Sequence, residues 1–169
     1  MKSKREYPDL PRIGVGGVVI RDGRALLIRR GTEPLKGEWS IPGGMLDIGE
    51  TLAEGVVREL LEETGLRVKI VELIEVFERI FYPDEKSAVA LAAPLEERAA
   101  QSASLRPLYH FVIVDYLCEA AEGTPRPGSD VTDVAFAAED DLARFSLTPT
   151  ATRVIKKAFA MAGERAKAR

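Results

Sequence analysis

The sequence predicts an α+β protein in which a mixed β-sheet is sandwiched between helices, as an α/β/α sandwich. Three observations support this fold class. Strand-like stretches come in closely spaced pairs, a helix-like stretch stands between them, and a second helix-like stretch closes the chain. Most connections between the strands are too short for the helical crossovers of a parallel sheet, so a doubly wound fold is not expected.

The first two strands form a predicted hairpin over residues 13–30. Two aliphatic runs flank Asp22 and Gly23, a dipeptide that suits the positive φ angles of a tight turn. Residues 31–44 are rich in glycine and proline, and we expect a loop there with a short strand near Trp39.

A helix is predicted from Thr51 to Gly65. Thr51 and Glu54 have the spacing of a capping box, and Gly65 is a natural C-terminal stop. Later strands and a closing helix with a basic end complete the fold. Their ranges are 66–81, 108–120 and 131–137 for the strands and 148–166 for the helix.

The chain length of 169 residues predicts a single domain, residues 1–169, with a core of about residues 12–166. An insertion-like loop interrupts it at about residues 82–106. That loop is longer than a usual hairpin connection, and such loops are either functional or disordered.

Composition excludes several classes of protein. A net charge of −3 gives no general affinity for nucleic acid or for anionic membranes. The single cysteine, Cys118, excludes an internal disulfide and a cysteine-based zinc cluster, and it favours a reducing compartment. The N-terminus does not resemble a signal peptide, and no apolar run approaches the roughly 18 residues that span a bilayer. We therefore expect a cytoplasmic protein.

The stretch RELLEETG, residues 58–65, places three glutamates on one helix face. With Leu52 set at zero, Glu59, Glu62 and Glu63 fall at about 340°, 280° and 20° around the axis. Like charges at this spacing weaken a helix by a few tenths of a kcal/mol. A bound cation would compensate, and magnesium prefers carboxylate oxygens. The alternative is a solvated acidic face.

The remaining helix positions support an acidic site. Gly55 lies inside the acidic arc, where a missing side chain would let a ligand or loop approach. Arg58 borders the arc and is expected to bridge to a carboxylate. Apolar residues are expected to form the buried side, opposite the acids. They are Ala53, Val56, Val57, Leu60 and Leu61.

A glycine-rich turn, IPGGMLDIGE, comes directly before this helix. The complete pattern is Gly44, five residues, Glu50, seven residues, Arg58-Glu59-Leu60, one residue, Glu62-Glu63, one residue, and Gly65-Leu66. The sequence resembles the Nudix hydrolases at every defined position of the Nudix box. Trp39, Pro42 and Gly43 also stand where that superfamily usually has them.

The resemblance implies a reaction: hydrolysis of a diphosphate linkage in a nucleoside diphosphate derivative, with Mg²⁺ or Mn²⁺. The metal ligands that it implies are Glu59, Glu62, Glu63, the Gly44 carbonyl, and Glu50 as a ligand or hydrogen-bond partner. The catalytic residues that it implies are Glu62, Glu63, Glu59 and Arg58, the last of which orients the carboxylates.

A general base must take the proton of the attacking water. Glu62 and Glu63 are the first candidates. Later acids are weaker ones: Asp130, Asp133, Glu139, Asp140 and Asp141. For substrate contact the candidates are Arg29 or Arg30, which alternate faces at a strand end, and Trp39, whose alternative role is core packing. His110 is interpreted as structural.

Substrate preference is predicted from the later chain. The strand HFVIVDYLCEA and the stretch SLTPTATRVI resemble the ADP-ribose pyrophosphatase-like branch, although residues 82–106 are longer than in such relatives and Phe136 replaces a common tryptophan. An ADP-ribose-like substrate is therefore placed ahead of (d)NTPs. The alternatives are a (d)NTP pyrophosphohydrolase and a nucleotide sensor without activity, which would be expected to have degenerate box carboxylates. The expected partners are a small-molecule nucleotide and, by analogy, a second copy in a homodimer, without nucleic acid or membrane.

Overall fold

The computed structural model describes residues 6–33, 35–83, 106–120 and 123–168. The chain divides into two compact units. The smaller unit contains Met1–Ile13 and Phe77–Ile113, and the larger unit contains Gly14–Val76 and Val114–Arg169. The predicted insertion at 82–106 lies almost wholly outside the described residues.

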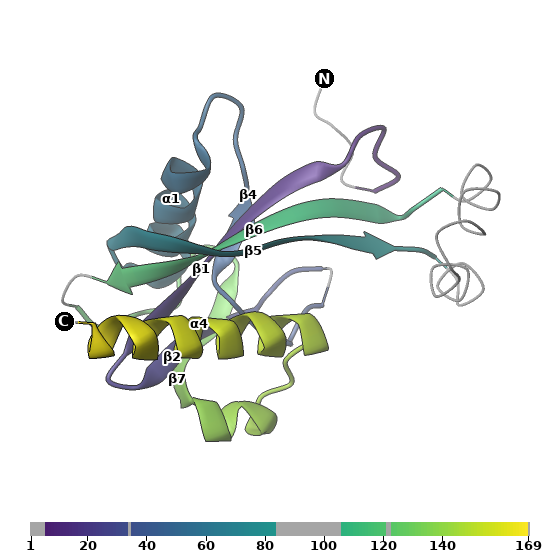
Figure 1. Ribbon diagram of the computed structural model, residues 1–169. Helices are drawn as coiled ribbons and strands as arrows, with labels where there is room; N and C mark the ends of the chain where they lie inside the picture. Colours follow the sequence, from purple (N-terminus) through teal and green to yellow (C-terminus); the bar gives the residue numbers. More distant parts are fainter. Residues whose placement is uncertain (1–5, 34, 84–105, 121–122, 169) are drawn as a thin grey trace, which may run out of the picture. The chain divides into compact units, whose positions relative to one another are not determined.

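Four strands precede the first helix, three strands follow it, and a second long helix closes the described chain, in the order that the sequence predicts (Figure 1). The strands are β1 Arg12–Arg21, β2 Arg24–Arg30, β3 Trp39–Ser40, β4 Gly43–Met45, β5 Val68–Phe81, β6 Tyr109–Ala120 and β7 Val131–Ala138. The helices are α1 Leu52–Thr64, a 3-10 helix η1 Glu139–Arg144, and α4 Pro149–Lys167. The strand order is β3-β2-β1-β6-β5, with β4 pairing with β1 and β7 pairing with β2. The predicted fold class, a mixed sheet with helices, is confirmed.

The predicted hairpin is confirmed in β1 and β2. Asp22 and Gly23 have φ angles of 50° and 69°, and Arg21 pairs with Arg24 across the turn. Both turn residues therefore have the positive φ angles that a two-residue hairpin turn with a right-handed strand twist requires.

The core of the larger unit joins α1 to the sheet. Its buried cluster consists of Val15, Val19, Leu26, Val56, Leu60, Leu66 and Cys118. Gly17 of β1 makes this packing close, because a Cβ atom there would lie 3.0 Å from Val56 Cγ1 and 3.1 Å from Leu60 Cδ1. Gly17 thus packs directly against α1.

The predicted buried side of α1 is partly wrong. Val56 and Leu60 are buried, but Ala53 is exposed and Leu61 is 40% exposed. Glu63 is instead 5% exposed. The reason is a long-range contact: α1 packs against β4 as well as against the apolar core, so the buried arc includes part of the acidic face.

Two short elements, β4 and η1, were not predicted from the sequence. β4 has three residues and pairs with β1 in antiparallel register, Val15 opposite Gly44. The η1 helix occupies the acidic stretch after β7. Both are too short to show a periodic pattern of apolar residues.

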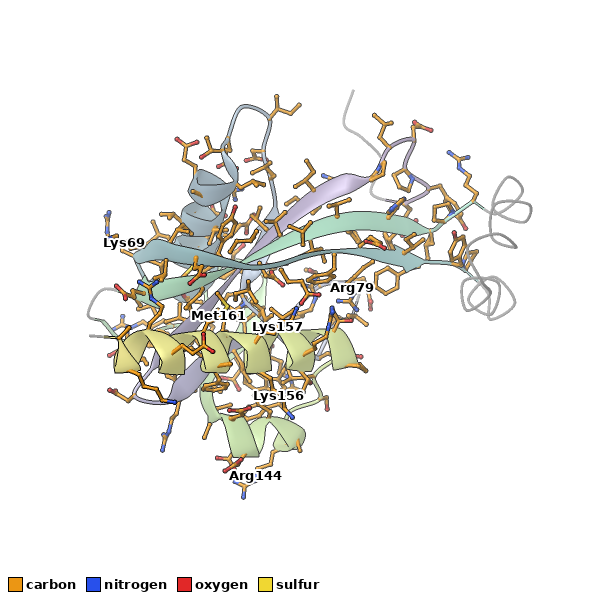
Figure 2. The ribbon with its side chains drawn as sticks, viewed as in Figure 1. Lys69, Arg79, Arg144, Lys156, Lys157 and Met161 are labelled. Atoms are coloured by element: carbon orange, nitrogen blue, oxygen red, sulfur yellow. The ribbon has the colours of Figure 1, made fainter. Side chains whose placement is uncertain are left out.

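The closing helix α4 begins at the N-cap Thr148, whose hydroxyl accepts from the Ala151 N–H at 3.2 Å. Its basic residues include Lys156 and Lys157 (Figure 2). Glu75 of β5 pairs with Lys157 at 2.5 Å and with Arg153. Among the described helices, none is both long enough and apolar enough to cross a bilayer.

Candidate active site

Caps at both ends set the position of α1. The Thr51 hydroxyl accepts from the Glu54 N–H at 3.2 Å, and the Glu54 carboxylate accepts from the Thr51 N–H at 2.8 Å. At the other end, Gly65 has a φ of 71° and its N–H donates to the Leu61 carbonyl at 2.9 Å. The predicted capping box and glycine stop are confirmed, and they fix the directions of the acidic side chains between them.

Glu63 is a buried carboxyl with a backbone partner. Its Oε2 accepts from the Gly43 N–H of β4 at 2.7 Å. Burial raises the pKa of Glu63 to about 8, although the Gly43 hydrogen bond opposes the rise. The neighbouring charges of Glu59 and Asp130 raise it further, and that of Arg30 lowers it. A carboxyl in this environment gains from a nearby cation.

Glu59 lies against the same short strand. A Cβ atom on Gly44 would lie 2.3 Å from the Glu59 carboxyl carbon, so only glycine leaves room for this carboxylate. Burial raises the pKa of Glu59, and Arg58 partly offsets that effect. Glu59 and Glu63 therefore both approach the backbone of the Gly43-Gly44 pair.

Arg58 holds two carboxylates at once. Its Nε and Nη2 donate to Glu50 at 2.6 and 2.9 Å, and its Nη1 donates to Glu59 at 2.8 Å. Nη2 also donates to the Met45 carbonyl at 3.0 Å. The hydrogen bond from Arg58 lowers the pKa of Glu50 to about 2. These contacts restrain the Glu50 and Glu59 carboxylates relative to Arg58.

Glu62 differs from its neighbours because its side chain is half exposed. One oxygen lies 3.5 Å from Arg58 Nη1. It is thus the box glutamate with the most open access to solvent.

Gly55 leaves room for a close approach by a loop, one of the two alternatives, ligand or loop, that its place in the acidic arc predicts. A Cβ atom there would lie 2.8 Å from Leu46 Cδ1 and 3.2 Å from Val15 Cγ2. The loop before α1 therefore approaches the helix closely at this glycine.

The donor set fits a hard divalent cation in its chemistry. Every candidate ligand is an oxygen, and two of the carboxyls have a pKa that burial raises, which bound positive charge would reverse. In the part of the chain that the structure describes, no three acidic, histidine or cysteine side chains form a finished metal cage. The Arg58 guanidinium instead donates to the Glu50 and Glu59 carboxylates.

The three residues predicted to contact substrate, Arg29, Arg30 and Trp39, have different surroundings. Arg30 acts on Glu63 through its charge, whereas exposed Arg29 donates to the Gly37 carbonyl at 3.0 Å. Trp39 packs edge to face on Phe145, with ring centroids 5.0 Å apart. This contact corresponds to core packing, the alternative to substrate contact that the sequence left open for Trp39.

Of the late acids, the structure brings Asp130 toward the glutamates. Its charge acts on both Glu59 and Glu63. Asp133 accepts from the Val134 N–H, and Asp141 pairs with Arg144 within η1. The pairing of β2 with β7, which sets Arg30 opposite Val131, explains the position of Asp130.

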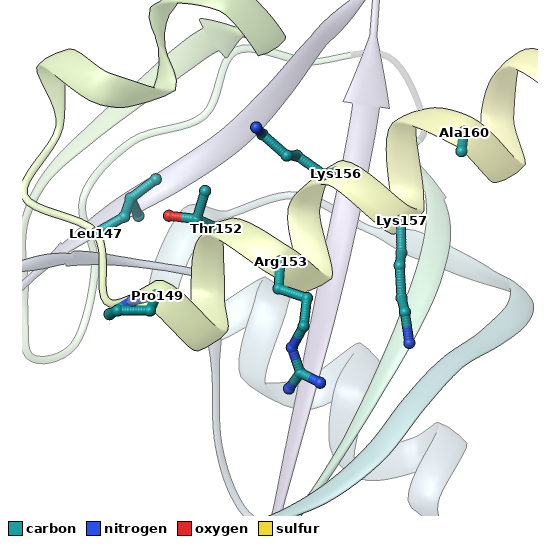
Figure 3. A pocket seen from close by; sticks show the side chains of 7 residues that line it. All are labelled: Leu147, Pro149, Thr152, Arg153, Lys156, Lys157 and Ala160. Carbon is teal, nitrogen blue, oxygen red and sulfur yellow. The ribbon is translucent and has the colours of Figure 1, made fainter.

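A shallow pocket on α4 is a separate feature (Figure 3). Its lining residues are Leu147, Pro149, Thr152, Arg153, Lys156, Lys157 and Ala160. None of these residues belongs to the acidic site.

The fold and the acidic helix together define a class of protein, the Nudix-fold domains. A family model of the NUDIX domain matches residues 10–158, and the chain belongs to that family. The chain is also similar to a solved MutT NUDIX hydrolase from Burkholderia pseudomallei, with 30% identity and a TM-score of 0.67 over 88% of this chain and 98% of that one.

Two curated relatives have names that specify a substrate. A putative ADP-ribose pyrophosphatase of Bacillus subtilis is 31% identical over 141 residues, which are 83% of this chain and 56% of the relative. An ADP-ribose pyrophosphatase of Methanocaldococcus jannaschii is 45% identical over 67 residues, 40% of either chain. The matches thus span only 40% to 56% of these relatives' own lengths.

Proposed function

We propose that this protein is a Mg²⁺-dependent pyrophosphohydrolase that cleaves the diphosphate linkage of a nucleoside diphosphate derivative. The observation that supports this most directly is the pair of carboxyls that face the Gly43-Gly44 backbone, buried Glu63 and partly buried Glu59, beside exposed Glu62. Burying carboxyls without a cationic partner is costly, and Glu63 has none at hydrogen-bond distance among the interactions described above. A cation and a phosphate would supply the compensation.

Glu59, Glu62 and Glu63 would hold the cation, with Glu50 and the Gly44 carbonyl as further ligands. When bound, a divalent cation neutralises phosphate charge and lowers the pKa of water. Mn²⁺ has the same preference for carboxylate and water oxygens, so it is the expected substitute.

The chain's own residues perform the remaining work. Arg58 fixes the Glu50 and Glu59 carboxylates in one orientation, and Gly43 does the same for Glu63 through its N–H. Glu62, with open access to solvent, accepts the proton of the attacking water. The water oxygen bonds to one phosphorus, the bridging P–O bond breaks, and the products are a nucleoside monophosphate and a phosphorylated remainder.

An ADP-ribose-like substrate is the preferred choice within this class. Two relatives named as ADP-ribose pyrophosphatases support it. Arg30, whose positive charge acts on Glu63, is the proposed contact for a substrate phosphate. We also propose that the protein is a homodimer, by analogy with Nudix relatives, and that it works in the cytoplasm, since its single cysteine fits a reducing compartment.

The test is product release from a panel of substrates, with and without Mg²⁺. The panel contains ADP-ribose, NADH, diadenosine polyphosphates, nucleotide sugars and (d)NTPs, and phosphate is measured after a coupling phosphatase or pyrophosphatase. We expect metal-dependent cleavage of ADP-ribose to be fastest. If (d)NTPs are cleaved faster than ADP-ribose, the proposed preference for an ADP-ribose-like substrate is wrong. Ligand binding without cleavage across the panel would reject the enzyme in favour of a sensor.

A further inference from the structure

The last turn of α1 is bonded to a distant part of the chain. The Arg126 N–H donates to the Thr64 carbonyl at 2.9 Å, and the Gly128 N–H donates to the Glu63 carbonyl at 3.0 Å. Carbonyls in the last turn of a helix lack partners within the helix. Residues 126–130, called here the 126–130 segment, supply two of those partners at the turn that contains Glu62 and Glu63.

The contact is close because residue 128 is glycine. A Cβ atom on Gly128 would lie 2.3 Å from the Glu62 carbonyl oxygen and 3.5 Å from its carbon. Both are backbone atoms of α1, so no side-chain rotation can relieve such a clash. Any larger residue must push the 126–130 segment away from the helix, or the last turn of the helix away from its present place.

The other end of the 126–130 segment is bonded to the residues that follow β2. The Gly31 N–H donates to the Asp130 carbonyl at 2.7 Å, and the Thr32 hydroxyl donates to Asp130 Oδ2 at 2.7 Å. Between the two ends, the Val131 N–H donates to the Gly128 carbonyl at 3.0 Å and closes a turn.

The segment thus joins two groups of residues that the proposed reaction needs. On one side are Glu62 and Glu63 of α1, and on the other is Arg30 at the end of β2. Asp130, at the end of the segment, lies near enough for its charge to act on Glu59 and Glu63. A shift of the 126–130 segment would therefore change the positions of Glu62 and Glu63 relative to Arg30.

We propose that Gly128 is a positioning residue: it sets the distance between the 126–130 segment and α1, and thereby the directions in which Glu62 and Glu63 present their carboxylates to a divalent cation. This inference rests on the proposed function. Gly128 touches neither substrate nor cation and acts through the backbone of the two glutamates. Changes in the groups that hydrogen-bond metal-ligating side chains typically alter metal affinity by about 10- to 100-fold, and Gly128 acts on the same ligands through their backbone.

The test compares Gly128→Ala with a matched control, Gly163→Ala, in the full chain. Gly163 lies in α4, where an added Cβ meets no atom within 4 Å. Binding of Mn²⁺ alone is measured by the electron paramagnetic resonance signal of the free ion, and circular dichroism monitors the fold. We expect Gly128→Ala to bind Mn²⁺ at least ~10-fold more weakly with its fold retained, and Gly163→Ala to bind like wild type.

A kinetic measurement distinguishes a positioning role of Gly128 from a general loss of protein stability. For the substrate found in the panel, Gly128→Ala should need more Mg²⁺ for half-maximal velocity and should lower kcat, while KM stays unchanged. If Gly128→Ala binds Mn²⁺ as the control does, while Glu63→Gln binds weakly, the positioning role is rejected and the proposed function remains. If wild type neither binds Mn²⁺ nor cleaves the panel, the proposed function itself is wrong.

A second variant covers the case in which Gly128→Ala does not fold. Thr32→Val removes the hydroxyl that donates to Asp130 and adds no atom against α1. It loosens the segment at its far end, so Mn²⁺ binding should weaken by about 2- to 12-fold, the scale of one hydrogen bond. Unchanged Mn²⁺ binding in Thr32→Val would then overturn the proposal.

Discussion

Two glutamates of the larger unit, Glu75 and Glu63, lie in two regions with opposite electrostatic environments. Glu75 of β5 faces Arg153 and Lys157 of α4, and these hydrogen bonds and charges lower its pKa. Glu63 of α1 is buried against the Gly43 N–H, and burial raises its pKa to about 8. The difference shows that acidic residues alone do not define a site. A carboxylate that pairs with basic side chains, as Glu75 does, links two structural elements. A buried carboxyl without such a partner, as Glu63 is, is a candidate for binding a cation.

The largest effect expected from this comparison is on turnover. Glu63→Gln keeps the size of the side chain but removes the charge that the proposed site requires. We expect turnover of the best panel substrate to fall by at least ~100-fold, and Glu62→Gln to do the same, because each loses a metal-held or acid-base contribution. Glu75→Gln is the matched control and should leave turnover unchanged. Near-normal turnover in both box variants would remove the mechanism.

Arg58 tests whether the orientation of the carboxylates matters as well as their charge. Arg58→Ala removes the hydrogen bonds to Glu50 and Glu59. Turnover should fall by about 10- to 100-fold, as expected for a group that orients metal ligands. Arg153→Ala removes the corresponding arginine of the other region and should have little effect. Steady-state kinetics at saturating Mg²⁺ measure both, and equal losses in the two variants would contradict the comparison.

The pH dependence of stability should have opposite signs in the two regions. Without metal, the folded protein keeps a proton on Glu63 up to a pKa of about 8, whereas the unfolded chain releases it near 4.5. The contribution of Glu63 to stability is thus present below about pH 4.5 and is lost as pH rises toward 8. Glu75, whose pKa is lowered, contributes above its unfolded pKa and loses that contribution in acid.

Urea unfolding in EDTA at pH 5 and pH 8.5 measures this difference. One pKa unit corresponds to about 1.4 kcal/mol, so Glu63→Gln should be more stable than wild type by at least that amount at pH 8.5. The gain should shrink at pH 5, where Glu63 is largely protonated in the folded state. An equal gain at the two pH values would show that Glu63 is not the titrating group.

The acidic helix could be predicted from sequence because its determinants are local. The box residues lie on one helix with both of its caps, so spacing alone indicates that Glu59, Glu62 and Glu63 share a face and that Arg58 reaches a carboxylate. The structure agrees on each of these points. The wrong expectation was that the acids lie opposite the buried side.

That error and the missed contacts have a common physical cause. Glu63 is buried because β4 pairs with β1 and presents the Gly43 N–H, and a strand of three residues leaves no periodic signal. Asp130 approaches the box because β7 pairs with β2, a contact between residues far apart in the sequence. Local spacing therefore predicts which residues share a helix face, and only tertiary pairing decides what that face meets.

The smallest expected effect is on the stability of the α4 contact. Glu75→Gln weakens pairs with Arg153 and Lys157, whose side chains are about half exposed. Ion pairs at exposed sites contribute only about 0.2–1 kcal/mol, and water and salt replace part of what is lost. Urea unfolding at pH 7 should show a loss within that range, and the difference from wild type should shrink in 1 M NaCl because added salt screens the pair. A loss of several kcal/mol that salt does not reduce would mean that Glu75 is a buried charge of the same kind as Glu63, and the distinction between the two regions would fail.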